Sequence, residues 1–145
     1  MDMVATMVIE NHIVDVEVPG PGLYEITGDL NERLKALQIE SGLMTLFIQH
    51  TSASLLIQEN ADPSAKRDLE VWLNRLVPEN DVIYSHVAEG ADDMPAHIKA
   101  MLTAVNLSIP ISKRALVLGT WQGVFLWEHR RATKKRQIVL NVVGR

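Results

Sequence analysis

The order of helix-like and strand-like segments restricts the fold of this 145-residue chain more than any single motif. Strand-like segments occur before, between and after three helix-like segments, and several strands are neighbours in the sequence. Parallel strands need long, usually helical, crossovers between them, whereas antiparallel strands can follow one another directly. We therefore predict a single α+β domain, residues 1–145, in which about three helices back a largely antiparallel sheet.

Apolar residues at helical spacing define the three helices. We expect the first helix to be capped by Asp29 and closed by Gly42, and the second to begin at Asp62 and Pro63. The third is expected over residues 95–105. The side chains predicted to face the core are Leu30, Leu34 and Leu37 in the first helix, Leu69, Trp72, Leu73 and Leu76 in the second, and Ile98, Met101, Leu102 and Val105 in the third.

Short runs rich in Val, Ile and Leu, several of them alternating with polar residues, predict the strands. A polar corner at residues 50–53 joins two of them. A basic segment near the C-terminus is expected to join the last two as a hairpin. The predicted strands cover residues 4–18, 43–48, 54–58, 82–86, 107–111, 115–118, 122–129 and 137–143.

The charge pattern argues against a general nucleic-acid binder. The net charge is −4, while such domains usually carry excess Lys and Arg on one face. Five of the fourteen basic residues nevertheless lie within residues 130–136, which fits either a solvated turn or a phosphate-facing loop. No apolar run is long enough to cross a bilayer, and Asp2 and Glu10 do not fit a signal peptide. We expect a cytoplasmic protein with no membrane partner.

The chain has no cysteine, so protein ligands to a metal must be histidines or carboxylates. His50 follows an apolar run and precedes the hydroxyl residues Thr51 and Ser52. His86 precedes an acidic loop, and His97 lies near the start of the third helix. Any single histidine can instead be a structural residue, and the spacings between these three match no compact ligand motif.

Two further candidates lie on the strand at residues 122–129. His129 shares a face with Phe125 and Trp127, whereas Glu128 points to the opposite face. One of this pair is expected to face a pocket. Trp121 and Trp127 fit either an aromatic wall for a substrate ring or ordinary core packing.

Three groups of segments, in this order and with these separations, resemble the YjbQ-like family, also called the secondary thiamine-phosphate synthases. The resemblance covers essentially the whole chain. The segments are Phe47 to Leu55 followed by Glu59 to Pro63, then His86 with Ala96 to Lys99, and finally Leu118 to Gly123 leading to Glu128, His129 and Arg130.

The resemblance implies a homotrimer with a cluster of histidines and polar residues near the subunit boundaries. Its implied metal ligands are His50, His86 and His97, with His50, His97, Glu128 and His129 as catalytic residues. Residues implied to bind the substrate are Thr51, Ser52, Asn60, Asp62, Trp121, Gln122 and Arg130. Whether Glu89, Asp92 or Asp93 joins the site stays open.

The family name implies an enzyme that couples hydroxymethylpyrimidine diphosphate to a thiazole phosphate. We therefore expect thiamine-phosphate synthase activity, a small phosphorylated ligand and a divalent metal ion. Histidines with carboxylates suit Zn, Ni, Fe or Mn, while Mg prefers the oxygens of an acidic loop. The alternatives are a non-catalytic metal- or phospholigand-binding protein and a metal-dependent phosphoester hydrolase.

Overall fold

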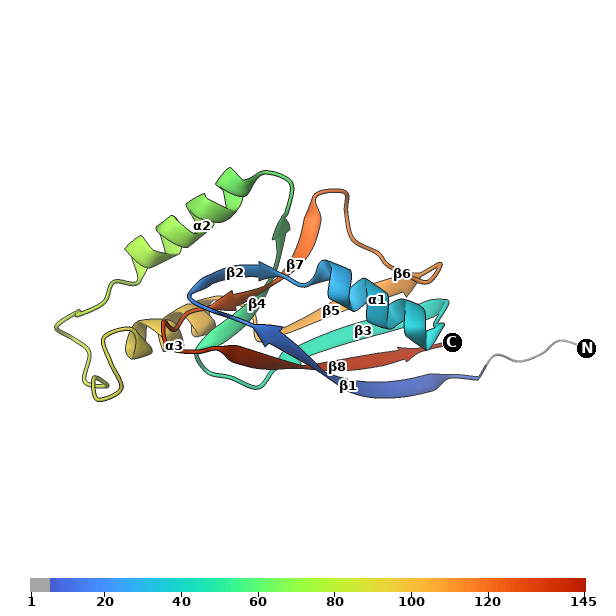
Figure 1. Ribbon diagram of the computed structural model, residues 1–145, viewed down its shortest axis with the longest axis horizontal. Coiled ribbons are helices and arrows are strands. Elements are labelled where there is room, and N and C mark those ends of the chain that lie inside the picture. The colour runs from blue at the N-terminus through green and yellow to red at the C-terminus, as the bar shows by residue number, and fades with distance from the viewer. Residues whose placement is uncertain (1–5) are drawn as a thin grey trace, which may run out of the picture.

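The computed structural model describes residues 6–145 and has the predicted α+β composition (Figure 1). Part of the first predicted strand, at Val4 and Ala5, lies outside the described residues. The elements are β1 (Val8–Glu17), β2 (Gly22–Glu25), α1 (Thr27–Leu37), β3 (Ser41–Ile48), β4 (Ala53–Glu59), α2 (Pro63–Leu76), α3 (Asp93–Leu102), β5 (Asn106–Ser112), β6 (Ala115–Leu116), β7 (Gln122–Glu128) and β8 (Lys135–Gly144).

The strands form two antiparallel sheets instead of one. The larger has the order β1-β8-β3-β5-β6, and the smaller has the order β2-β7-β4. The polar corner at residues 50–53 is where the chain leaves the large sheet at the end of β3 and enters the small sheet at β4. His50 therefore lies at a junction between the two sheets.

One face of the large sheet carries the main core. Helix α1 lies over this face in Figure 1, and its Leu30 and Leu34 are fully buried in the same cluster as Leu46 of β3 and Leu140 of β8. The small sheet adds Leu126 to that cluster. Burying one such leucine contributes about 1.5–3 kcal/mol, so this layer holds the two sheets and α1 together.

Strand β7 is buried on both faces. Its even-numbered side chains, such as Leu126, join the main core, while Phe125 and Trp127 pack in a second cluster with Leu73 of α2. The small sheet therefore lies between the large sheet and α2. This arrangement turns Glu128 toward the large sheet and His129, which follows the strand, toward the helices.

The ends of α1 differ from the prediction. The helix begins at Thr27 after Ile26, so Asp29 lies in its first turn and is not the cap. It ends at Gln38, which adopts the left-handed conformation with φ of 56°, and Gly42 belongs to β3. The prediction for α2 is confirmed, because the Asp62 side chain accepts a hydrogen bond from the backbone N–H of Ser64 and Pro63 starts the helix.

The predicted apolar faces of α2 and α3 are confirmed only in part, because Leu69, Leu73 and Ile98 pack in the second cluster but the other predicted side chains do not. In α2 only Leu73 is buried, and Trp72 and Leu76 are exposed, because the helix contacts the small sheet along a narrow strip. In α3, which begins at Asp93 and ends at Leu102, the buried residues are Asp93, Pro95, Ala96 and Ala100, whereas Met101, Leu102 and Val105 are exposed. Small alanine side chains allow this helix to approach β4 closely.

Two strand predictions are also wrong. Residues 82–86 form no strand, and Val82 and Ile83 are highly exposed in the irregular segment between α2 and α3. The basic residues 130–136 do not close a hairpin, because β7 and β8 belong to different sheets. Arg130 and Arg136 are instead held by carboxylates, as described below.

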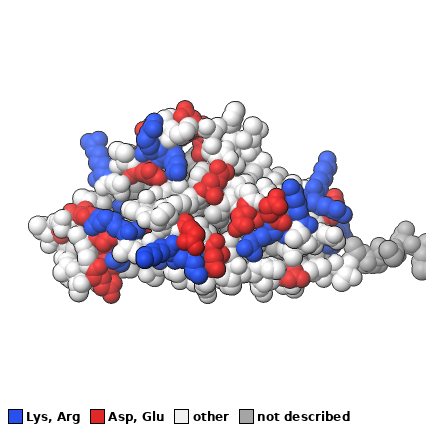
Figure 2. All heavy atoms as spheres, viewed as in Figure 1, with Lys and Arg blue, Asp and Glu red and all other residues white. Residues whose placement is uncertain are grey.

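Acidic and basic side chains alternate across the face of the molecule shown in Figure 2, with no purely basic area on that view. Within residues 6–145, none of the helices has the length and apolar character that a membrane crossing requires.

Candidate metal centre and adjoining cavity

The carboxylate of Asp93 is the centre of a histidine cluster. Asp93 is the first residue of α3, and its side chain is only 2% exposed. Its Oδ2 atom lies 2.7 Å from Nε2 of His86 and 3.1 Å from Nε2 of His97, while Oδ1 accepts a hydrogen bond from Arg130. Asp93 and His97 share a helix face because they are four residues apart, and the segment between α2 and α3 supplies His86.

The hydrogen bonds of His97 define its tautomer. Its Nδ1 lies 2.9 Å from the carbonyl oxygen of Thr51, which can only accept, so Nδ1 carries a proton. A neutral His97 then directs the lone pair of Nε2 toward Oδ2 of Asp93, which is also an acceptor. Two facing acceptors require a cation between them, either a second proton on the imidazole or a metal ion.

The cluster has the ligand set of a metal site. One ring nitrogen from each of His86 and His97 and one oxygen of Asp93 all lie within 4.8 Å of one another. The backbone hydrogen bond at Nδ1 of His97 is the outer contact that metal-bound histidines usually make. Three protein ligands leave a coordination position free for water or substrate, as in catalytic zinc sites. Glu89 is an additional candidate, since its Oε2 lies 3.9 Å from Nε2 of His86.

Arg130 supports this cluster from the opposite side. Its guanidinium donates to Asp93, to Oδ2 of Asp92 at 3.1 Å and to the carbonyl oxygen of Glu89 at 2.9 Å. Asp92 also accepts the backbone N–H of Arg131 at 2.9 Å. Arg130 is therefore occupied by the protein itself, and its role here is to position the acidic loop.

Both aspartates are held in the charged form. Burial by itself raises the pKa of Asp93, but the hydrogen bond from His86 and the nearby His97 and Arg130 outweigh it, so the pKa lies below the ordinary value. Burial likewise opposes ionisation of Asp92, and its hydrogen bonds to Arg131 and Arg130 lower its pKa. An ionised Asp93 is the form that a metal ion needs.

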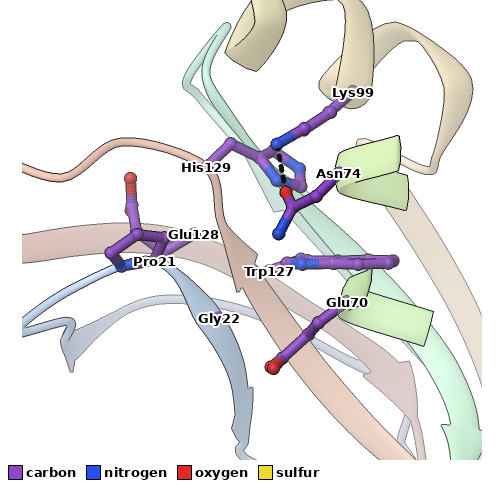
Figure 3. Close-up of a pocket in the computed structure, with 8 residues that line it drawn as sticks. All are labelled: Pro21, Gly22, Glu70, Asn74, Lys99, Trp127, Glu128 and His129. Atoms are coloured by element: carbon purple, nitrogen blue, oxygen red, sulfur yellow. Dashed lines mark hydrogen bonds between the residues drawn. The ribbon is translucent and has the colours of Figure 1, made fainter. Parts of the chain in front are cut away.

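Two adjoining cavities lie beside this cluster, between α2, α3 and the end of β7. Figure 3 shows the residues that line the smaller one. The two cavities have volumes of about 150 and 290 Å³, and both are lined by Pro21, Asn74, Lys99 and His129. Nζ of Lys99 donates to Oδ1 of Asn74 at 2.6 Å. Burial is the main reason that the pKa of Lys99 is lowered.

His129 contributes a neutral imidazole to the cavities. Its Nε2 lies 2.9 Å from Oγ of the buried Ser54, and its ring lies 5.5 Å from that of Trp127. Burial, together with the charges of Lys99 and Arg136, lowers the pKa of His129 to about 3. The imidazole is therefore a weak base, suited to hydrogen bonding more than to proton abstraction near neutral pH.

Comparison with known proteins identifies the family. A profile described as "UPF0047 protein YjbQ-like" matches residues 13–145. The chain belongs to the YjbQ-like family.

Relatives and solved structures agree with this assignment. A UPF0047 protein of Synechocystis is 44% identical over 97% of this chain and 95% of its own length, and UPF0047 protein YjbQ of Escherichia coli O157:H7 is 41% identical over 85% and 89%. A conserved hypothetical protein of Thermus thermophilus superposes with a TM-score of 0.78 at 35% identity, covering 89% of this chain and 97% of its own. A YbjQ-like protein of unknown function from Sulfolobus solfataricus has the same fold, with a TM-score of 0.86 at 21% identity, covering 97% of this chain and all of its own.

In this YjbQ-like chain, the expected ligand set is only partly assembled. His86 and His97 come together, but the group of three ligands contains Asp93 where His50 was expected. Nε2 of His50 accepts the backbone N–H of Gln137 in β8 at 3.3 Å, which holds the imidazole at the sheet junction. Burial and the charge of Arg136 lower the pKa of His50, against the opposite effect of Glu128.

The implied substrate residues divide between the two ends of the β4–β7 ladder. Thr51 and Ser52 lie at the histidine end, where the Thr51 carbonyl contacts His97 and Ser52 accepts from Arg136. Residue 53 pairs with 128 and residue 59 with 122, so the other end is about 20 Å away at 3.3 Å per residue. At that far end lie Asn60, bonded to Glu25, Asp62, which caps α2, Gln122, bonded to Gly119, and the exposed Trp121.

Sequence reasoning overlooked Lys99, Asn74 and Glu70, which line the cavities. One signal was available for Lys99. It follows Asp92 by seven residues and Pro95 by four, a spacing that places all three on one helix face. The positions of Asn74 and Glu70 depend on how α2 docks on the small sheet, which local pattern does not reveal.

Glu128, which was expected to be catalytic, is engaged in a buried ion pair with Arg136. Its side chain is fully buried, and its Oε2 and Oε1 atoms accept hydrogen bonds from Nε and Nη2 of Arg136 at 2.5 and 2.7 Å. Arg136 also donates to Oγ of Ser52 at 2.9 Å. This two-bond pair links β7 of the small sheet to β8 of the large one.

We predict that Arg136→Met destabilises the fold by about 3–5 kcal/mol, because it leaves the Glu128 carboxylate buried without its partner. The double variant Glu128→Leu, Arg136→Met should recover most of this loss in urea unfolding. The exposed pair between Arg114 and Glu40 is the control, and Arg114→Met should cost less than about 1 kcal/mol. An equally small effect of Arg136→Met would contradict the structural role.

We also predict a pH effect from His129. Its pKa of about 3 in the fold lies below the ordinary 6.5, so the unfolded chain binds more protons between these values. The free energy of unfolding should therefore fall as the pH drops below about 6.5, by up to about 1.4 kcal/mol per pH unit from this residue. Urea unfolding between about pH 6.5 and 4.5 should give a shallower dependence for His129→Gln. Identical slopes would show that His129 does not stay neutral.

Proposed function

We propose that this YjbQ-like protein binds a divalent transition metal through His86, Asp93 and His97. The observation that carries the proposal is the pair of facing acceptors, Nε2 of His97 and Oδ2 of Asp93, with Nε2 of His86 beside them. Zinc is the first candidate, because two imidazoles and one carboxylate suit it, and Ni, Fe and Mn follow. Magnesium fits less well, since it prefers an all-oxygen environment.

We further propose that the centre supports thiamine-phosphate synthase activity, in which hydroxymethylpyrimidine diphosphate and a thiazole phosphate form thiamine phosphate and pyrophosphate. A bound metal ion would neutralise charge on the departing diphosphate. The protein's own part is to keep Asp93 ionised, through His86, His97 and Arg130, and to leave a coordination position open. The family resemblance supports this choice of substrates, and on the same basis we propose a homotrimer and a small phosphorylated ligand.

The metal proposal predicts that protein purified without a histidine tag contains close to one transition metal per subunit by mass spectrometry. His86→Ala, Asp93→Asn and His97→Ala should each lose most of it, because each removes one of three ligands. His50→Ala should retain it, and Asp29→Asn on the surface of α1 controls for the lost charge. Retention in all three ligand variants, or no uptake of zinc by the wild type, would refute the centre.

The synthase proposal predicts thiamine phosphate formation by the metal-loaded wild type, detected by chromatography of the product. His97→Ala should lower kcat/KM by about 100-fold or more, as expected when a catalytic metal site is lost. The assay also separates the alternatives. Phosphate release from a single phosphoester, without coupling, would assign a hydrolase, and tight metal or phospholigand binding with no turnover would assign a binding protein.

A further inference from the structure

The two cavities between α2, α3 and β7 contain a lysine with no anionic partner. Lys99 is half-buried, and its ammonium group makes one hydrogen bond, to Asn74, and no ion pair with any carboxylate of residues 6–145. Removing a charged amine from water is costly unless an opposite charge or hydrogen bonds replace the water. The ammonium keeps two further N–H donors for a ligand.

Two more donors accompany Lys99. The amide nitrogen of Asn74 has no acceptor among the described residues, and Figure 3 shows Asn74, Lys99 and the ring of His129 gathered on one side of Trp127. The fully buried Ser54 hydroxyl lies 2.9 Å from Nε2 of His129. In the tautomer in which this hydroxyl donates to Nε2, the neutral ring carries its proton on Nδ1. Nδ1 has no partner among residues 6–145, and His129 lines both cavities.

The nearby carboxylates are already occupied. Asp92 is bound by Arg130 and by the backbone of Arg131, and Glu79 pairs with the Arg131 side chain. Oε1 of Glu70 accepts the backbone N–H of Leu23 at 2.9 Å, and Glu70 lies on the other side of Trp127 from Lys99 in Figure 3. The cavities thus combine one unpaired cation with neutral donors on one side and an acidic group on the other.

We propose that Lys99, Asn74 and His129 form a binding site for a single oxyanion, the phosphoryl or carboxylate group of a small molecule. Cavities of about 150 and 290 Å³ have room for such a group and a short attached fragment. Glu70 and Glu79 at their walls disfavour an extended polyanion such as a nucleic acid.

This site is separate from the proposed metal centre. Lys99 shares its face of α3 with Asp92 and Pro95, which also line the larger cavity, while Asp93 and His97 occupy a different face. Oxyanion binding therefore requires no metal. The two proposals can fail independently of each other.

The test is calorimetric titration of inorganic phosphate into the full-length protein after chelator treatment, at constant ionic strength. We expect saturable binding to the wild type that weakens about tenfold or more in Lys99→Ala and Lys99→Gln, because a charge-assisted hydrogen bond is lost. Lys99→Arg should retain part of the affinity. Lys35→Ala removes an equal charge from the exposed surface of α1 and should leave binding unchanged.

Lys99→Gln removes the charge but keeps a polar side chain that is one atom shorter, so it disturbs packing less than Lys99→Ala. Circular dichroism and unfolding midpoints check that both variants fold. Succinate supplied as a competitor distinguishes the two ligand types. Displacement of phosphate indicates a site for carboxylates as well, and no displacement restricts it to phosphoryl groups. No saturable phosphate binding by the wild type, or equal affinity in wild type and Lys99→Gln, would overturn the proposal whatever the metal content.

Discussion

Burial of β7 on both faces is the constraint on which the rest of the molecule depends. Its even-numbered side chains pack toward the large sheet and its odd-numbered ones toward α2. The same alternation directs Glu128 inward, to the pair with Arg136 that joins the sheets, and His129 outward, to the cavities. Neighbouring residues thus have different environments. His129 lines both cavities, whereas Glu128, at the wall of the smaller cavity, pairs with Arg136 and joins the two sheets.

Periodicity predicted the parts of the fold that local chemistry controls. The α+β class, the antiparallel pairing and the start of α2 at Asp62 all follow from residues close together in the chain. The buried faces of α2 and α3 could not be predicted this way, because Met101 and Leu102 fit a core-facing stripe as well as Ala96 and Ala100 do. Which stripe is buried depends on close approach to β4 and on the inward-facing Asp93. These features belong to the tertiary structure and are not encoded in the local sequence pattern.

The residue types of the candidate site, histidines and carboxylates, could be predicted from the sequence. Which individual residues come together could not. His86 and His97 were found from their neighbours, yet Asp93 could not be separated from Asp92 or Glu89 by sequence, since all three belong to one acidic loop. Asp93 is the carboxylate that joins the cluster, because α3 begins at this residue and places it one helical turn before His97. His50 has the same local features as a ligand, but the docking of β4 against β7 and the contact to Gln137 hold it at the sheet junction.

The contact between His86 and Asp93 also ties the segment between α2 and α3 to the start of α3. The chain between the end of α2 and the start of α3 has no helix or strand of its own, and its apolar Val82 and Ile83 find no core. Such a segment is kept in one conformation mainly by the hydrogen bonds that its residues make to the neighbouring helices and strands. Here those hydrogen bonds include the one between His86 and Asp93 and the one that Arg130 donates to the Glu89 carbonyl oxygen. Susceptibility of this segment to a protease thus reports, without any assay of turnover, whether the Asp93 carboxylate still holds its partners.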